Sequence, residues 1–269
     1  MSVVLDLKNV SVKLDDKVIV ENSSFTVRKG ECLGILGESG SGKSMTVKAV
    51  LGLLDKNFET SGVAIFNGEN LLNKSKESLR NIRGKDITMV LQNPMTCFDP
   101  LYRIGNQMAE TFKTHTNWSN EEIYKNSLDI LNRMKIRDGE EVLKKYPHQI
   151  SGGMLQRIMI GIAMAMKPKL LIADEPTTAI DAITQYEIMQ EFQKIKEEHE
   201  TAMIFITHDL GAVSLIADDI VVMNNGKIVE RGDFNHIIHN SKDSYTRLLV
   251  EKRISVMKKY REVVYREEV

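Results

Sequence analysis

The sequence predicts an α/β fold with a parallel sheet as its core, an antiparallel β-rich part at the N-terminus and an inserted helical part. Residues 1–35 alternate between apolar and polar side chains, whereas residues 105–166 carry helical periodicity alone. After residue 170, two short apolar runs flank a helical pattern, which is typical of parallel strands. We expect one domain over residues 1–250, with helices inserted at about 95–165, and a charged tail over 251–269.

The composition excludes several classes of protein. A formal net charge of -1 provides no positive field for nucleic acid, so we expect no nucleic-acid partner. The two cysteines, Cys32 and Cys97, lie far apart without metal-binding spacing, which suits a reducing compartment. The longest apolar run, residues 158–166, is shorter than the roughly 20 residues of a membrane-spanning helix, so a membrane role would require a partner.

The N-terminal part should contain five strands, because short apolar or alternating runs are separated by turn residues. These runs cover residues 3–7, 18–27, 31–36, 62–66 and 86–91. The turn signals Lys29-Gly30 and Asn67-Gly68 close two of them. A helical pattern over Met45 to Leu53 follows the third run, so a strand should lead directly into a helix there.

The helical insertion has helix ends that can be recognised. Ser119 and Glu122 form a capping-box pattern, and the apolar face that follows includes Ile123 and Ile130. A second helix should run from Ser151 to Met166.

Strands return after the insertion. The apolar runs 170–173 and 202–206 flank a helix that places Ile188, Phe192 and Ile195 on one face. The segment 220–229 contains Asn224-Asn225-Gly226 between two apolar runs, which predicts a hairpin.

One loop fits the phosphate-binding pattern G-x-x-x-x-G-K-[ST], and it lies between a predicted strand and a predicted helix. It consists of Gly37, Glu38, Ser39, Gly40, Ser41, Gly42, Lys43 and Ser44. Its glycines let backbone N–H groups face phosphate oxygens, and the following helix adds its positive end. Lys43 supplies a charge for the β- and γ-phosphates, and the Ser44 hydroxyl can bind Mg²⁺. We therefore expect ATP and Mg²⁺ as ligands.

Two acidic residues at the end of the strand 170–173 complement this loop. Asp174 and Glu175 follow the apolar run directly, where α/β sheets bind their ligands. Asp174 is expected to hold Mg²⁺, and Glu175 to orient or deprotonate an attacking water. These two motifs together indicate a P-loop NTPase.

A third motif is more specific. Ile150-Ser151-Gly152-Gly153-Met154 resembles the signature motif of the ABC ATPase family, usually L-S-G-G-Q, with Ile and Met at its two ends. The resemblance covers about residues 3–250, and other family motifs follow in order. Gln92 resembles the glutamine of the Q-loop, Asp181 lies in a segment (178–181) that resembles the D-loop, and His208 resembles the switch histidine.

The resemblance implies roles for these residues. Glu175, His208 and Gln92 are expected to be catalytic, with Gln92 also a magnesium ligand beside Ser44 and Asp174. Ser151, Gly152, Gly153 and Asp181 are expected to contact nucleotide. One family feature is missing: no aromatic residue precedes Phe25 to stack on adenine, so Leu14, Val18 or Ile19 would supply an aliphatic substitute.

The surroundings of Gln92 (residues 89–100) and of the signature motif (146–157) resemble importers of dipeptides, oligopeptides and nickel. Many peptide importers carry a cysteine-containing C-terminal extension, and this sequence has no cysteine after Cys97. This favours nickel, cobalt or a metal chelate as cargo, with di- or oligopeptides as the alternative. A soluble ABC ATPase outside transport is a further alternative, although the chain has one motif set and no sustained heptads.

The family resemblance also implies partners. Each signature motif in the family caps the ATP of the opposite subunit, so a second ATP-binding subunit is expected, identical or homologous. Two transmembrane permease subunits and an extracytoplasmic substrate-binding protein would complete the importer. The chain would then be peripheral, on the cytoplasmic face of the cell membrane.

Overall fold

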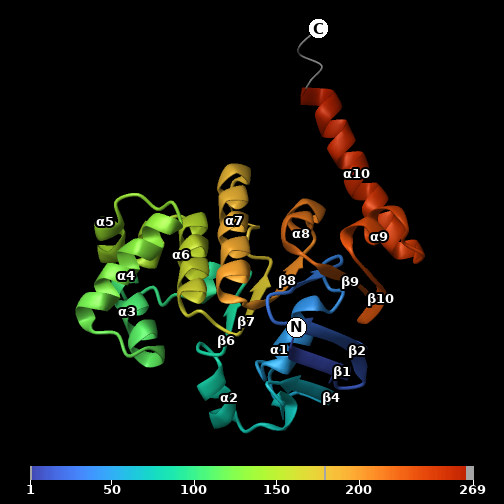
Figure 1. The fold of residues 1–269 in the computed structure, drawn as a ribbon, viewed down its shortest axis with the longest axis horizontal. Coiled ribbons are helices and arrows are strands. Elements are labelled where there is room, and N and C mark those ends of the chain that lie inside the picture. Colours follow the sequence, from blue (N-terminus) through green and yellow to red (C-terminus); the bar gives the residue numbers. More distant parts are fainter. Residues whose placement is uncertain (1, 179, 265–269) are drawn as a thin grey trace. The chain divides into compact units, whose positions relative to one another are not determined.

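The computed structural model describes residues 2–178 and 180–264, and these fall into two compact units (Figure 1). The first unit combines the segments Met1–Leu5, Val27–Glu31 and Asn73–Ile204. The second combines Asp6–Thr26, Cys32–Leu72 and Phe205–Val269. The last five residues of the predicted tail, 265–269, lie outside the described part of the chain.

The helices and strands follow one another as Figure 1 labels them. The strands are β1 (Val3–Leu14), β2 (Lys17–Arg28), β3 (Cys32–Leu36), β4 (Phe58–Phe66), β5 (Glu69–Asn70), β6 (Ile87–Val90), β7 (Leu170–Asp174), β8 (Ala202–Thr207), β9 (Asp219–Asn224) and β10 (Lys227–Gly232). The α-helices are α1 (Lys43–Val50), α2 (Lys76–Ile82), α3 (Ile104–His115), α4 (Asn120–Arg133), α5 (Gly139–Lys144), α6 (Gly152–Ala165), α7 (Ala182–His199), α8 (Leu210–Ile216), α9 (Phe234–His239) and α10 (Ser244–Val264).

The second unit contains antiparallel and parallel strand pairs. The N-terminal strands form a four-stranded sheet in the order β2-β1-β4-β5, and β4 and β5 run antiparallel. β3 pairs in parallel with β9, with Leu33 opposite Asp219, and β10 returns antiparallel along β9. The turn between β9 and β10 has positive φ at Asn225 and Gly226, as a two-residue hairpin turn requires, so the predicted hairpin is confirmed.

The first unit holds the inserted helices and a second parallel pair. β6 pairs in parallel with β7, with Ile87 opposite Leu170. Helices α3 to α6 occupy the predicted insertion, and α4 has the predicted capping box: Ser119 Oγ accepts from the Glu122 N–H at 3.2 Å, and Glu122 Oε2 accepts from the Ser119 N–H at 2.7 Å. Helix α6 matches the predicted helix, with Ser151 as its N-cap.

Several predicted boundaries differ from the observed ones. β4 begins at Phe58 rather than at residue 62, and its first half is largely exposed, so apolar alternation could not reveal it. β6 is shorter than predicted, and α1 begins at Lys43, inside the glycine-rich loop.

The predicted charged tail proves to be part of a long helix. Helix α10 begins at Ser244 and passes through the boundary that we expected at residue 250. Its first turns are buried, with Leu249 5% and Val250 4% exposed. The beginning of α10 therefore belongs to the core of the second unit. Among the described residues, no helix is long and apolar enough to cross a membrane.

Candidate functional site

The glycine-rich loop of the second unit connects β3 to α1 through a tight passage. A Cβ atom added at Gly37 would lie 2.4 Å from the carbonyl oxygen of Met223 in β9, so no side chain fits there. At Gly40, by contrast, an added Cβ would meet nothing within 4 Å. The loop is thus pressed against the sheet at its start and open at its middle, as a cradle for a ligand would be.

Lys43 folds back over this loop. Its side chain is 6% exposed, and its ammonium group donates to the carbonyl oxygens of Gly37 at 2.8 Å and Glu38 at 2.9 Å. The ammonium is therefore positioned at the centre of the loop. A phosphate group there would receive a full positive charge and could take over the hydrogen bonds of the two carbonyls.

Two further features suit an anionic ligand. Helix α1 starts at Lys43 behind Gly42 and has neither a side-chain cap nor an acidic residue in its first turn. The buried Ser41 Oγ has no hydrogen-bond partner among the described residues. A helix N-terminus without an acid and an unsatisfied hydroxyl both fit phosphate oxygens.

The strand β2 lies against the other side of the loop. A Cβ added at Gly42 would lie 3.2 Å from Val20 Cγ2 and 3.3 Å from the Ile19 carbonyl. Val18 is 46% exposed and, because strand side chains alternate, it shares a face with Val20. Val18 is therefore the most accessible of the three predicted substitutes for an aromatic residue.

His208 also belongs to the second unit. It follows β8 directly, is half-buried, and precedes Asp209, which caps α8. The Thr207 hydroxyl accepts from the Asp209 N–H at 3.0 Å and shapes this turn. The histidine thus lies at the carboxyl end of β8, at the strand end where it was predicted.

The predicted acidic pair lies at the end of β7 in the first unit. Asp174 is 3% and Glu175 is 9% exposed. Glu175 has a φ of 49°, which is uncommon for a residue other than glycine and is associated with functional sites. The Thr178 hydroxyl lies 3.2 Å from the Glu175 carbonyl and 3.3 Å from its Oε2, so it helps to hold this carboxylate.

A residue without a predicted role, Gln156 of α6, connects two predicted motifs. Its side chain is 1% exposed, and its Nε2 donates to the carbonyl of Leu91 at 3.3 Å and of Pro176 at 2.9 Å. Leu91 immediately precedes Gln92, and Pro176 immediately follows Glu175. The signal that could have identified Gln156 is a polar residue on an otherwise apolar helix face.

The signature segment forms the start of α6. Ser151 Oγ accepts from the Met154 N–H at 3.2 Å and caps the helix, which begins where it was predicted to begin. A Cβ added at Gly152 would meet nothing within 4 Å, so this helix N-terminus is open to a ligand. Arg157 on the next turn donates to the carbonyls of Met134 and Lys135, at 3.2 and 3.0 Å, and ties α6 to the end of α4.

The other predicted residues of the first unit are more exposed. Gln92 lies in the exposed segment after β6. Asp181 is the N-cap of α7, and its Oδ1 accepts from the Thr184 N–H at 3.0 Å. This backbone hydrogen bond is the main reason why the pKa of Asp181 lies below its usual value. Residue 179, between these motifs, lies outside the described part of the chain.

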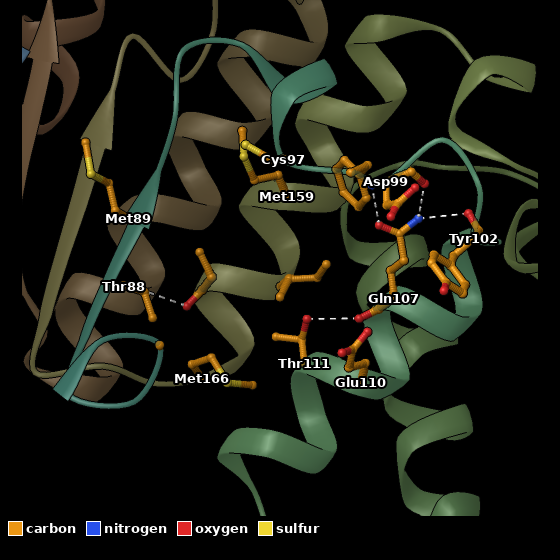
Figure 2. A pocket seen from close by; sticks show the side chains of 14 residues that line it. Thr88, Met89, Cys97, Asp99, Tyr102, Gln107, Glu110, Thr111, Met159 and Met166 are labelled. Carbon is orange, nitrogen blue, oxygen red and sulfur yellow. Dashed lines mark hydrogen bonds between the residues drawn. The ribbon is translucent and has the colours of Figure 1, made fainter. Parts of the chain in front are cut away.

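A cleft of about 770 Å³ lies between β6, α3 and α6 (Figure 2). Its lining includes Cys97, Phe98 and Asp99, which follow Gln92 in the chain. Gln107 of α3 shapes its rim: its Oε1 accepts from the Asp99 N–H at 2.9 Å, and its Nε2 donates to the carbonyls of Asp99 and Tyr102 at 2.9 and 2.8 Å. Tyr102 and its neighbour Leu101 are 57% and 78% exposed. The cleft therefore has a fixed polar rim beside the exposed side chain of Tyr102.

Within each unit, the structure brings together some of the predicted residues. In the second unit, the glycine-rich loop, Lys43 and the strand β2 form one surface. In the first unit, Gln156 connects the segments of Gln92 and Glu175, and its own helix begins at the signature serine. The residues predicted to bind phosphate and the predicted acidic residues are thus each positioned by the ends of strands and helices.

Comparisons with known proteins place this chain in a family. Residues 20–178 match the ABC transporter family. The metal-staphylopine import system ATP-binding protein of Staphylococcus aureus (strain NCTC 8325 / PS 47) is 44% identical over 93% of this chain and 92% of that protein. The oligopeptide transport ATP-binding protein of Haemophilus influenzae is 42% identical over 91% of this chain and 77% of that protein. A dimeric ATP-binding cassette, solved in a post-hydrolysis state with ADP and Pi, has a TM-score of 0.77 at 28% identity, covering 86% of this chain and 98% of that one.

The connection made by Gln156 can be tested by substitution. Gln156→Met keeps the length of the side chain but removes the amide that donates to the carbonyls of Leu91 and Pro176. A buried carbonyl left without a hydrogen bond costs about 1–3 kcal/mol. We expect ATP hydrolysis to slow about tenfold while the Kd for ATP stays within twofold of its original value. Gln190→Met, on an exposed position of α7, is the matched control. Undiminished hydrolysis by Gln156→Met would show that the connection is dispensable.

Proposed function

The chain belongs to the ABC transporter family and is an ATPase, and we propose that it drives an importer of nickel, cobalt or a related metal chelate. The observation that carries the cargo proposal is the 44% identity to the metal-staphylopine import protein, which extends over 93% of this chain. Di- or oligopeptides are the second candidate, since the oligopeptide and dipeptide transport proteins are 42–43% identical to this chain.

The proposed site binds ATP chiefly through the glycine-rich loop. Lys43 exchanges the carbonyls of Gly37 and Glu38 for the β- and γ-phosphates, while the N-terminus of α1 and the Ser41 hydroxyl face phosphate oxygens. Ser44, Asp174 and Gln92 offer hydroxyl, carboxylate and amide oxygens, the hard donors that Mg²⁺ prefers, and the bound ion would offset phosphate charge.

The proposed catalytic step is the attack of a water molecule on the γ-phosphate. Glu175 orients this water and accepts its proton, and the left-handed backbone at this residue together with Thr178 limits where its carboxylate can point. Gln92 and His208 assist at the γ-phosphate. Gln156 supports this step indirectly, because it holds the backbone beside both Gln92 and Glu175.

The proposed working assembly contains a second ATP-binding subunit. Ser151, Gly152 and Gly153 of one subunit would meet the ATP held by the other, with Asp181 at the same junction. The open N-terminus of α6 supports this proposal, since an added Cβ at Gly152 meets nothing within 4 Å. ATP that touches both subunits favours the closed pair through differential affinity, and hydrolysis releases it.

The proposed membrane partners are two permease subunits, with a substrate-binding protein on the far side of the membrane. The cleft in Figure 2 supports a permease contact, because Tyr102 in its lining is 57% exposed, and the preceding residue, Leu101, is 78% exposed. A permease segment bound there would sense the conformation of the Q-loop. The chain would then work on the cytoplasmic face of the membrane, as a peripheral subunit.

Glu175→Gln tests the catalytic assignment. The amide keeps the shape of the side chain but cannot accept a proton, so we expect hydrolysis to fall more than tenfold, about 1.4 kcal/mol in the barrier, with ATP binding retained. The ATP-bound pair with the second subunit should accumulate and be visible by size-exclusion chromatography. Glu59→Gln, on an exposed position of β4, is the control. A decrease of less than tenfold would mean that another group is the principal base.

The absence of an adenine-stacking aromatic residue predicts weak base discrimination. We expect ATP and GTP to compete within a hundredfold in affinity, measured by displacement of a fluorescent nucleotide. Val18→Tyr should lower the Kd of both purine nucleotides several-fold, because stacking on an aromatic contributes about 1–3 kcal/mol. Val3→Tyr adds an aromatic at a similarly exposed strand position, 48% against 46%, and should change nothing. A larger preference for ATP would indicate another contact to the base.

The cargo proposal is tested by uptake in cells that lack this gene. Accumulation of labelled nickel and cobalt in metal-poor medium should fall to background and return when the gene is restored, but not when Glu175→Gln is supplied. Growth on peptides as the sole source of a required amino acid is measured in parallel. Normal metal uptake together with failed growth on peptides would contradict the metal proposal and would identify peptides as the cargo.

A further inference from the structure

The long C-terminal helix α10 is anchored directly behind the glycine-rich loop. Leu249 and Val250 of α10 belong to the same buried cluster as Leu36, the last residue of β3, which immediately precedes Gly37. Figure 1 shows α10 beginning beside α9 in the second unit. The first turns of α10 are therefore fixed relative to the start of the loop.

The N-terminus of α10 is held by a hydrogen-bonded chain from β10. Glu230 of β10 accepts from the backbone N–H groups of Lys242 and Asp243 at 2.8 and 2.7 Å, and its other oxygen lies 3.0 Å from His236 Nε2. The Asp243 N–H is the main reason why the pKa of Glu230 lies below its usual value, although desolvation opposes this effect. Asp243 Oδ1 in turn accepts from the Tyr245 N–H at 2.9 Å. The backbone at Tyr245 is thus held in place.

The Tyr245 side chain reaches the loop itself. Its hydroxyl oxygen accepts from the Glu38 N–H at 2.9 Å. The carbonyl of the same peptide group, that of Gly37, accepts from Lys43 at 2.8 Å. One peptide of the loop is therefore held at both ends, by α10 on one side and by the phosphate-binding lysine on the other.

A second contact lies on the same face of α10. Lys252 is seven residues after Tyr245, which is two helical turns, and its Nζ lies 3.5 Å from Glu38 Oε1. Both side chains of this pair are largely exposed, 60% and 58%, so this ion pair contributes little. The hydroxyl of Tyr245 is the principal contact.

We propose that Tyr245 is a positioning residue for nucleotide binding: its hydroxyl fixes the Gly37–Glu38 peptide so that the loop is preformed for phosphate. When Lys43 leaves the Gly37 carbonyl for a phosphate, Tyr245 is what prevents this peptide from rotating. Helix α10 then determines the affinity of the loop for nucleoside triphosphates. The inference rests on the proposed phosphate-binding role of the loop.

Tyr245→Phe tests this role, because it removes the hydroxyl and keeps the ring. We expect the Kd for Mg·ATP of the full-length chain, measured by calorimetric titration, to rise about fivefold, which corresponds to one hydrogen bond of about 1 kcal/mol. The Kd for GTP should rise by the same factor, because the loop meets phosphates and not the base. The Tm without nucleotide should fall by no more than about 4 °C, because the same hydrogen bond also contributes about 1 kcal/mol to the folded state. Tyr124→Phe, an exposed tyrosine of α4, is the control, and Lys252→Gln should change the Kd less than twofold.

The outcomes separate this inference from the proposed function. Failure of the original chain to bind ATP would overturn the phosphate-binding role of the loop itself. Tight binding by the original chain with an equal Kd for Tyr245→Phe would overturn the inference alone. A change in thermal stability without a change in Kd would also overturn it, because Tyr245 would then serve only the packing of α10.

Discussion

The site depends first on how closely the chain passes the sheet at Gly37. The carbonyl of Met223 would lie 2.4 Å from any Cβ at this position, so β3 can turn into the loop only through a glycine. The position of the backbone at Gly37 determines where three later features lie. They are the Lys43 ammonium above the loop, the start of α1, and the Glu38 N–H that donates to Tyr245. A side chain at Gly37 would displace all of them together.

The chemistry of this protein is positioned by the ends of secondary-structure elements. Asp174 is the last residue of the buried strand β7, and Glu175 and His208 directly follow β7 and β8. Lys43 and Ser151, by contrast, stand at the beginnings of helices. Strand ends fix the direction of acidic and basic side chains, and helix starts present backbone N–H groups and a positive dipole end. The scaffold therefore places the proposed catalytic residues at strand ends and the proposed anion-binding groups at helix starts.

The sequence predicted the structure best where a short local pattern allows only one backbone conformation. The capping box at Ser119, the α6 start at Ser151 and the turn at Gly226 were predicted because each depends on a few adjacent residues. A polar residue on an apolar helix face could have drawn attention to Gln156, but its contacts could not be predicted, because Leu91 and Pro176 are 65 and 20 residues away. The contact of Tyr245 joins residues 207 positions apart in the chain and had no local signal. The exposed first half of β4 gave no periodic signal, since neither of its faces is buried there.

The folded-back position of Lys43 has a consequence for selectivity. Because the ammonium already has two carbonyl acceptors, at 2.8 and 2.9 Å, a simple anion gains little by replacing one of them. A polyphosphate replaces both at once and adds contacts along the loop, so its advantage grows with the number of its oxygens. Lys43 therefore favours ligands that carry several phosphate groups, and we expect sulfate or free phosphate to bind this loop more weakly than a nucleoside triphosphate.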